Sequence, residues 1–137
     1  MKICGIDPGI TGGIAFFDGH KVDACRVPTF KIANKKVLDM ESICRLLVFN
    51  EPELVFIEQQ HAMPRQGVAS TFKTGFNYGI YIGILHALNY EYSVVIPRKW
   101  KADLSVTSDK DQARMRATEL MPDGQSSWSL KCEDGVA

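Results

Sequence analysis

The sequence has no net charge, no hydrophobic run long enough to span a membrane and no paired cysteines. Sixteen Lys and Arg residues balance sixteen Asp and Glu residues, which excludes a uniformly basic protein that coats nucleic acid and argues against an acidic disordered tail. The longest apolar stretch, residues 80–88, contains Gly83 and His86 and falls short of the roughly 20 residues of a membrane helix. Asp7 lies where a signal peptide would still be apolar. We therefore expect a soluble, cytoplasmic protein that does not associate with membranes.

The four cysteines are too scattered to form a metal or disulfide motif. No Cys-x-x-Cys pair occurs, so the pattern supports neither a zinc knuckle nor a disulfide framework, and we expect reduced thiols. What remains is an ordinary globular composition, with 45% hydrophobic and 23% charged residues. A chain of 137 residues with this composition predicts one domain over 1–137.

The apolar pattern predicts three strands followed by alternating helices and strands. Apolar runs at 2–7 and 13–17, followed by an alternation of apolar and charged residues at 20–27, are separated by Pro-Gly and Asp-Gly turns and predict an antiparallel meander. Helical periodicity and buried apolar runs predict helices at 37–49, 68–88 and 108–120, the last with Ser108 as N-cap, and strands at 54–58 and 92–96. This order is typical of an α/β fold whose five-stranded mixed sheet, the meander plus two parallel strands, is flanked by helices.

Two acidic residues close predicted strands. Asp7 ends the first strand and Glu58 ends the fourth, and if these strands are parallel neighbours, both carboxylates lie on one rim of the sheet. At about 4 Å, two carboxylates repel by about 4 kcal/mol at an effective dielectric constant of 20. Either one binds a proton or both share a cation, and oxygen ligands favour magnesium or manganese over zinc. The alternative is that each acid merely caps a strand at the surface.

Four segments resemble, in order, those of the RuvC-type Holliday junction resolvases, particularly the phage-like branch. They are Gly5-Ile6-Asp7-Pro8-Gly9 with Thr11-Gly12, Val55-Phe56-Ile57-Glu58-Gln59, Ile96-Pro97-Arg98-Lys99-Trp100-Lys101 and Asp109-Lys110-Asp111-Gln112-Ala113-Arg114. The resemblance spans nearly the whole chain. It implies an RNase H-like fold and a homodimeric endonuclease that resolves four-way or other branched DNA junctions by two-metal phosphodiester hydrolysis, with Mg²⁺ as cofactor and Mn²⁺ as a substitute.

The resemblance also implies roles for individual residues. Asp7 and Glu58 match catalytic, metal-binding carboxylates, and Asp134 matches an acid of the family's last helix. The family has two acids in that helix, one turn apart, whereas this sequence ends at Ala137, so we expect the chain to be truncated within the helix. His61 stands where cellular enzymes of the family place an aromatic residue that stacks on a DNA base.

Positive charge is concentrated in the middle of the chain. Residues 61–116 carry eight basic and four acidic groups, a net charge of plus four, between two acidic regions. We expect a DNA-phosphate surface here, made up of Arg98, Lys99, Lys101, Lys110 and Arg114. Lys110 also resembles the family's DNA-contacting lysine. The alternative is a solvated helix face, because acidic residues are intermixed, and we interpret Trp100 as a packed anchor rather than a stacking platform.

Three glycines lie four positions apart in the long predicted helix, at Gly75, Gly79 and Gly83. They predict that another backbone, either the sheet or a second subunit, approaches this helix closely.

Two alternative functions stay open. One is a non-catalytic, junction-binding protein of the same fold. The other is a fragment of an actin-like or sugar-kinase ATPase, because Asp7-x-Gly9-x-Thr11-x-Gly13 also resembles the first phosphate loop of that superfamily.

Overall fold

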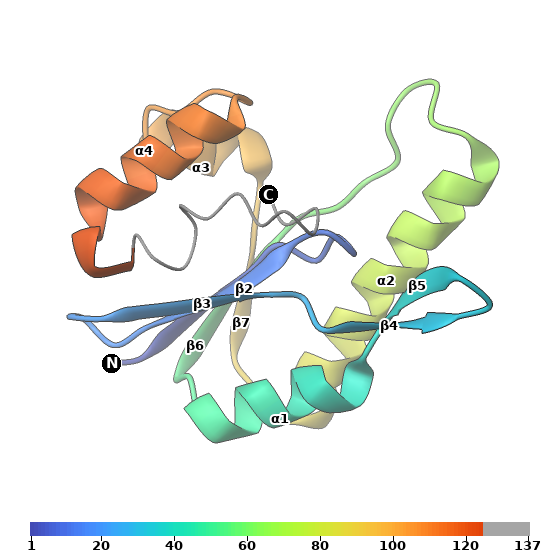
Figure 1. Cartoon of the computed structure of the whole chain (residues 1–137), viewed down its shortest axis with the longest axis horizontal. Coiled ribbons are helices and arrows are strands. Elements are labelled where there is room, and N and C mark those ends of the chain that lie inside the picture. The colour runs from blue at the N-terminus through green and yellow to red at the C-terminus, as the bar shows by residue number, and fades with distance from the viewer. Residues whose placement is uncertain (125–137) are drawn as a thin grey trace.

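The structure, a computed structural model, describes residues 1–124 of the chain. Its centre is a mixed sheet of five strands in the order β3-β2-β1-β6-β7 (Figure 1). Strand β1 pairs antiparallel with β2 and parallel with β6, which pairs parallel with β7. The strands span Ile3–Ile6 (β1), Gly13–Phe17 (β2), Val22–Arg26 (β3), Leu54–Glu58 (β6) and Tyr92–Val95 (β7). The predicted fold class, a meander plus two parallel strands, is confirmed.

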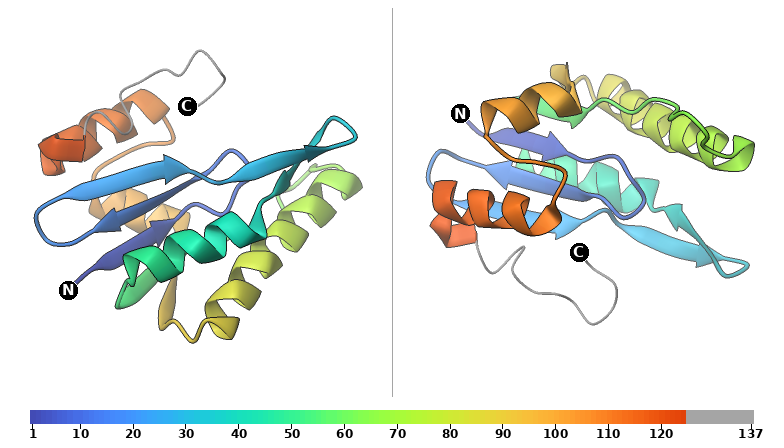
Figure 2. Two further views of the ribbon diagram at one scale, coloured as in Figure 1. Left: turned by 60° about the horizontal axis from the view of Figure 1, so that its bottom comes forward. Right: turned by 90° about the horizontal axis from the view of Figure 1, so that it is seen from above.

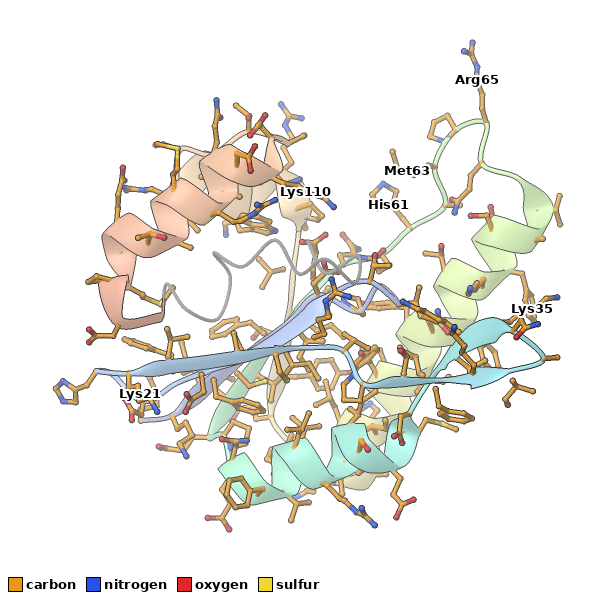
Figure 3. All side chains as sticks on the ribbon, in the orientation of Figure 1. Lys21, Lys35, His61, Met63, Arg65 and Lys110 are labelled. Atoms are coloured by element: carbon orange, nitrogen blue, oxygen red, sulfur yellow. The ribbon has the colours of Figure 1, made fainter. Side chains whose placement is uncertain are left out.

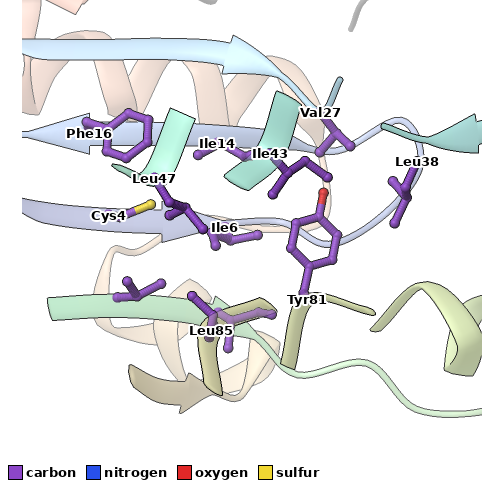
Figure 4. Close-up of a cluster of buried hydrophobic side chains, with 12 residues drawn as sticks. Cys4, Ile6, Ile14, Phe16, Val27, Leu38, Ile43, Leu47, Tyr81 and Leu85 are labelled. Carbon is purple, nitrogen blue, oxygen red and sulfur yellow. The ribbon is translucent and has the colours of Figure 1, made fainter. Parts of the chain in front are cut away.

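Helices α1 (Met40–Asn50) and α2 (Val68–Ala87) cover one face of this sheet and build the core. Ile43 and Leu47 of α1 and Tyr81 and Leu85 of α2 are fully buried against the sheet (Figure 4). The sheet contributes the alternate positions that face the same way: Cys4, Ile6, Ile14, Phe16, Val55 and Ile57. Because strand side chains alternate between faces, the residues between them point to the opposite face.

Helices α3 (Pro97–Asp103) and α4 (Lys110–Leu120), followed by the short helix η1 (Pro122–Gly124), lie on that opposite side (Figure 1). Neither α3 nor α4 has a buried residue. Arg116 Nε donates to the carbonyl oxygen of Leu104 at 3.1 Å and ties α4 to the end of α3. Within residues 1–124, the helices on this side therefore cover the sheet less closely than α1 and α2 cover the other side, and we call this side the open face.

The hairpin formed by β4 (Thr29–Ile32) and β5 (Lys35–Leu38) was not predicted. It extends away from the main sheet (Figure 2) and includes Val37 and Leu38, which the periodicity assigned to the first helix. That helix begins instead at Met40, where the Asp39 side chain accepts the Ser42 N–H at 3.0 Å. The hairpin turn has positive φ at Ala33 and Asn34, and the sequence offers only Asn34 as a signal for it.

Two further details of the helices differ from the prediction. Helix α3 was not predicted; it begins at Pro97, directly after β7, and proline favours this first helical position because its missing N–H would be unpaired there anyway. The N-cap of α4 is Asp109, not Ser108, and its side chain accepts the N–H groups of Asp111 and Gln112. The helices at 68–88 and 108–120 otherwise match α2 and α4 closely.

The glycine stripe on α2 does not face the sheet. A Cβ atom built at Gly75, Gly79 or Gly83 would meet nothing within 4 Å, so the interpretation in which the sheet approaches these glycines is wrong. The interpretation in which a second subunit approaches these glycines stays a prediction.

In residues 1–124, no helix is both long and apolar enough to cross a membrane.

Candidate metal and nucleic-acid site

Asp7 and Glu58 lie next to each other at the carboxyl ends of two parallel strands. Ile6 of β1 is opposite Ile57 of β6, so the next residue on each strand is again a neighbouring pair, and parallel strands lie about 4.8 Å apart. Both residues line the same cavity. The expectation that the first and fourth predicted strands are parallel neighbours is confirmed, and with it the placement of both carboxylates on one rim.

The turn after β1 holds Asp7 by its backbone and its side chain. The Asp7 N–H donates to Gly13 O at 2.9 Å, and the Gly9 N–H donates to Asp7 Oδ1 at 3.2 Å. The turn is closed by the Gly12 N–H, which donates to Gly9 O at 2.9 Å. A Cβ atom at Gly12 would lie 2.2 Å from Asp7 O, closer than any non-bonded contact allows. Only glycine fits at position 12 without displacing the backbone of Asp7.

Glu58 is partly buried, and its environment disfavours the ionised carboxylate. Burial and, secondly, the negative charge of Asp7 raise the pKa of Glu58 above its ordinary value. Two groups oppose this shift: the Trp100 indole N–H, which donates to Glu58 Oε2 at 3.1 Å, and the Lys101 ammonium. The rim therefore carries one exposed carboxylate and one that is partly desolvated and repelled by the first.

A cavity of about 870 Å³ opens beside these carboxylates, between the open face of the sheet and α3. Its polar lining consists of Asp7, Glu58, Ser93, Lys99, Trp100 and Asp103, and apolar residues of β1, β6, β7 and the segment around α3 line the rest. The cavity therefore brings the predicted carboxylates together with part of the predicted basic surface. A second cavity of about 200 Å³ lies between the turn after β1 and α2, and its lining includes Lys73 and the buried Asn77.

The predicted DNA-binding cations divide between the two helices of the open side. Arg98, Lys99 and Lys101 belong to α3, and Lys110 and Arg114 belong to α4. The Lys101 ammonium lies 5.5 Å from the centre of the Trp100 ring, and Arg114 pairs with Asp111 at 3.2 Å. Arg114 is thus partly neutralised, whereas Lys110 and Arg98 are exposed.

His61 lies in the exposed loop that follows β6. Figure 3 shows it above the sheet, on the side where Lys110 also lies. Asp134 lies outside the described residues. In the part of the chain that the structure describes, no group of three or more His, Cys, Asp or Glu side chains could hold a metal ion, so the described site is a pair of carboxylates.

Two residues at the site were not identified from the sequence. Trp100 was interpreted only as a packing residue, although it donates a hydrogen bond to Glu58. Its role could be found from the sequence only by recognising α3, because that helix turns the indole toward β6. Arg26 is the second. Gly13 pairs with Arg26 and accepts the Asp7 N–H, so Arg26 lies in the same row across the sheet as the two carboxylates.

Arg26 also has unused donors. Its Nε and Nη2 atoms are buried, and neither has a hydrogen-bond partner within residues 1–124. Buried donors without a partner are rare in proteins, because each loses its hydration without compensation. Side chains in one row of a sheet point to the same face, so Arg26 points to the side on which Asp7 and Glu58 lie.

No known protein-family profile matches the chain, and no curated protein is significantly similar to it in sequence. Among solved structures, Thermus thermophilus RuvC in complex with a Holliday junction substrate is similar, with a TM-score of 0.67 and 19% identity over 89% of this chain and 79% of that one. A structure of Thermus thermophilus RuvC has a TM-score of 0.59 and 18% identity over 89% of this chain and 81% of that one. The chain therefore has the RNase H-like fold of RuvC.

Proposed function

We propose that this protein is a magnesium-dependent endonuclease that nicks branched DNA, in particular four-way junctions. The observation that carries the proposal is the carboxylate pair, Asp7 and Glu58, on adjacent strand ends beside a cavity bordered by a basic helix. The fold supports it, because the similar RuvC structure holds a Holliday junction substrate. Carboxylates that hold metal beside cations that hold phosphate are the arrangement that phosphodiester hydrolysis needs.

The donor set suits a hard divalent cation. Both ligands are carboxylates, and the repulsion that raises the pKa of Glu58 is relieved when a cation lies between them. The Gly9 N–H donates to Asp7 Oδ1 and so holds that carboxylate in place. Oxygen ligands of this kind favour Mg²⁺, with Mn²⁺ as a substitute. In this proposal Asp134 supplies a third carboxylate.

The chain's own residues then bind and orient the DNA strand. When bound, magnesium stabilises charge on the phosphate and makes a bound water more acidic. Arg98, Lys99 and Lys101 of α3 contact phosphates that border the cleaved one, and Lys110 and Arg114 extend this contact along α4. His61 contacts the DNA from the loop after β6. Each of these cations adds affinity that depends on salt and does not depend on sequence.

The exposed face of α2 carries large apolar side chains. Val68, Phe72 and Phe76 are 88%, 73% and 59% exposed, and the two phenylalanine rings stack at 6.0 Å. Gly75 and Gly79 lie on the same helix with open space in front of them, so another helix can approach closely. We propose a homodimer through α2. It predicts that Phe72→Asp converts a dimer to a monomer in light scattering, and a wild-type monomer would contradict it.

The test of the function is a cleavage assay with a labelled synthetic four-way junction and a linear duplex of the same sequence. We expect nicks in the junction with Mg²⁺ and none in chelator, with the linear duplex cut far more slowly. Junction binding that survives chelator, without cleavage in any metal, would favour the non-catalytic junction-binding protein. ATP hydrolysis in the absence of DNA would favour the actin-like or sugar-kinase alternative.

A further inference from the structure

Trp100 links the basic helix α3 to the carboxylate rim through one atomic contact. Its indole Nε1–H donates to Glu58 Oε2 at 3.1 Å, across 42 positions of the sequence. Both side chains line the same cavity. We propose that Trp100 is a positioning residue, which holds the Glu58 carboxylate in the orientation that binds the metal. This inference rests on the proposed function, because it requires that Glu58 is a metal ligand.

The contact is rigid on both sides. Val95 of β7 is paired with Glu58, and the Gln59 N–H donates to Val95 O at 2.8 Å. Helix α3 begins two residues after Val95, with Pro97 as its first residue. The indole is therefore carried by a helix that starts directly from the strand beside Glu58. A tryptophan has only two side-chain torsions to fix, so holding it there loses little conformational entropy.

The hydrogen bond selects an orientation for a flexible side chain. A glutamate has three side-chain torsions, and an N–H donor is strongly directional, so the indole restricts Glu58 to conformers that keep Oε2 near Nε1. Oε1 takes no part in this bond and is left for the metal. Hydrogen-bond partners of metal ligands act in this way, and removing one weakens metal affinity or activity by about 10- to 100-fold.

The Lys101 ammonium, 5.5 Å from the ring centre, holds the indole from its face. The basic surface therefore contributes to the metal site through Trp100, in addition to any contact with phosphate. A residue that only filled the cavity would act through its volume, and phenylalanine would replace it. The N–H group is the part of Trp100 that the proposal requires.

The test compares the Mn²⁺ affinities of the full chain and of its variants. Binding is measured from the loss of the electron paramagnetic resonance signal of free Mn²⁺. Trp100→Phe keeps an aromatic ring and removes the N–H, and we expect it to weaken Mn²⁺ binding by about 10-fold at an unchanged melting temperature. Tyr90→Phe is the matched control, because it removes a hydrogen bond of 2.8 Å to Leu47 O on the far side of the molecule. We expect it to lower the melting temperature and to leave Mn²⁺ binding unchanged.

A double-mutant cycle with Glu58→Gln separates positioning from packing. If Trp100 acts through the Glu58 carboxylate, Trp100→Phe has no further effect on Mn²⁺ binding once Glu58 is glutamine. Equal Mn²⁺ affinity of wild type and Trp100→Phe, or an equal effect of this change in both backgrounds, would overturn the inference. Asp7→Asn tests the proposed function separately: if it leaves Mn²⁺ binding unchanged, the metal site itself is refuted.

Discussion

Gly12 offers a sharp test of the site, because its neighbour Gly9 provides a matched control in the same turn. A Cβ atom at position 12 would lie 2.2 Å from Asp7 O and 2.9 Å from Asp7 Cγ. Ordinary contacts between such atoms are about 3.5 Å, so Gly12→Ala must push the Asp7 backbone away by about 1 Å. At Gly9, by contrast, the nearest atom to a new Cβ is Asp7 Oδ1 at 3.5 Å, an ordinary contact.

This displacement is expected to lower both the nicking rate and the free energy of unfolding. A misplacement of about 1 Å at a catalytic group lowers the rate by about 100-fold, which corresponds to about 2.7 kcal/mol of activation free energy. Crowding a packed position also lowers the free energy of unfolding by about 1–3 kcal/mol. Gly9→Ala keeps the N–H that donates to Asp7 Oδ1, and we expect it to retain wild-type activity and stability.

The assay is the initial rate of four-way junction nicking in Mg²⁺, with the melting temperature of each variant measured in parallel. We expect Gly12→Ala to nick about 100-fold more slowly at a temperature where it is folded, and Gly9→Ala to nick as the wild type does. Wild-type nicking by Gly12→Ala would refute the argument that Asp7 is held by this turn. An equal loss in both variants would show that any side chain in the turn is harmful, whatever contacts it makes.

Two further predictions concern the carboxylates and the basic surface. The pKa of Glu58 is raised in the folded state, so the protonated side chain stabilises the fold at low pH, and this stability is lost as pH rises from about 4 through the raised pKa. In chelator, the melting temperature of Glu58→Gln should therefore increase relative to that of the wild type over this pH interval. A difference in melting temperature that does not change with pH would contradict this. For Lys110→Ala, junction binding in chelator should show a salt dependence whose logarithmic slope is smaller by about 1. Lys21→Ala, on the far end of the sheet and paired with Asp23 at 3.1 Å, should leave that slope unchanged.

The main sheet could be predicted from the sequence because four of its strands are short, mostly apolar runs and β3 alternates apolar with charged residues, each with a clear end. The neighbouring positions of Asp7 and Glu58 followed from strand order, since parallel strands bring their carboxyl ends to one rim. The β4–β5 hairpin was not predicted because each of its strands has only four residues and because they contain Lys31, Lys35 and Lys36. These lysines hide the apolar-polar alternation that is typical of a strand.

Other features depend on the folded arrangement and left no local signal. Pro97 both stops a strand and starts a helix, and without α3 the approach of Trp100 to Glu58 could not be foreseen. The position of Arg26 in one row with Asp7 depends on the pairing of Arg26 with Gly13 and on the hydrogen bond from the Asp7 N–H to Gly13 O. Pairings across several strands are set by register, which the sequence specifies only through the whole fold.

In the proposed function, the Asp7 and Glu58 carboxylates form a metal-dependent site for cleaving branched DNA. The most direct measurement is the rate of four-way junction nicking by Asp7→Asn and by wild type, at the same Mg²⁺ concentration and with both proteins shown to bind the junction in chelator. We expect the variant to bind as the wild type does and to nick more slowly by about 1,000-fold, as the loss of several kcal/mol of charge stabilisation implies. Equal nicking by the two proteins would show that Asp7 is not part of the cleavage site.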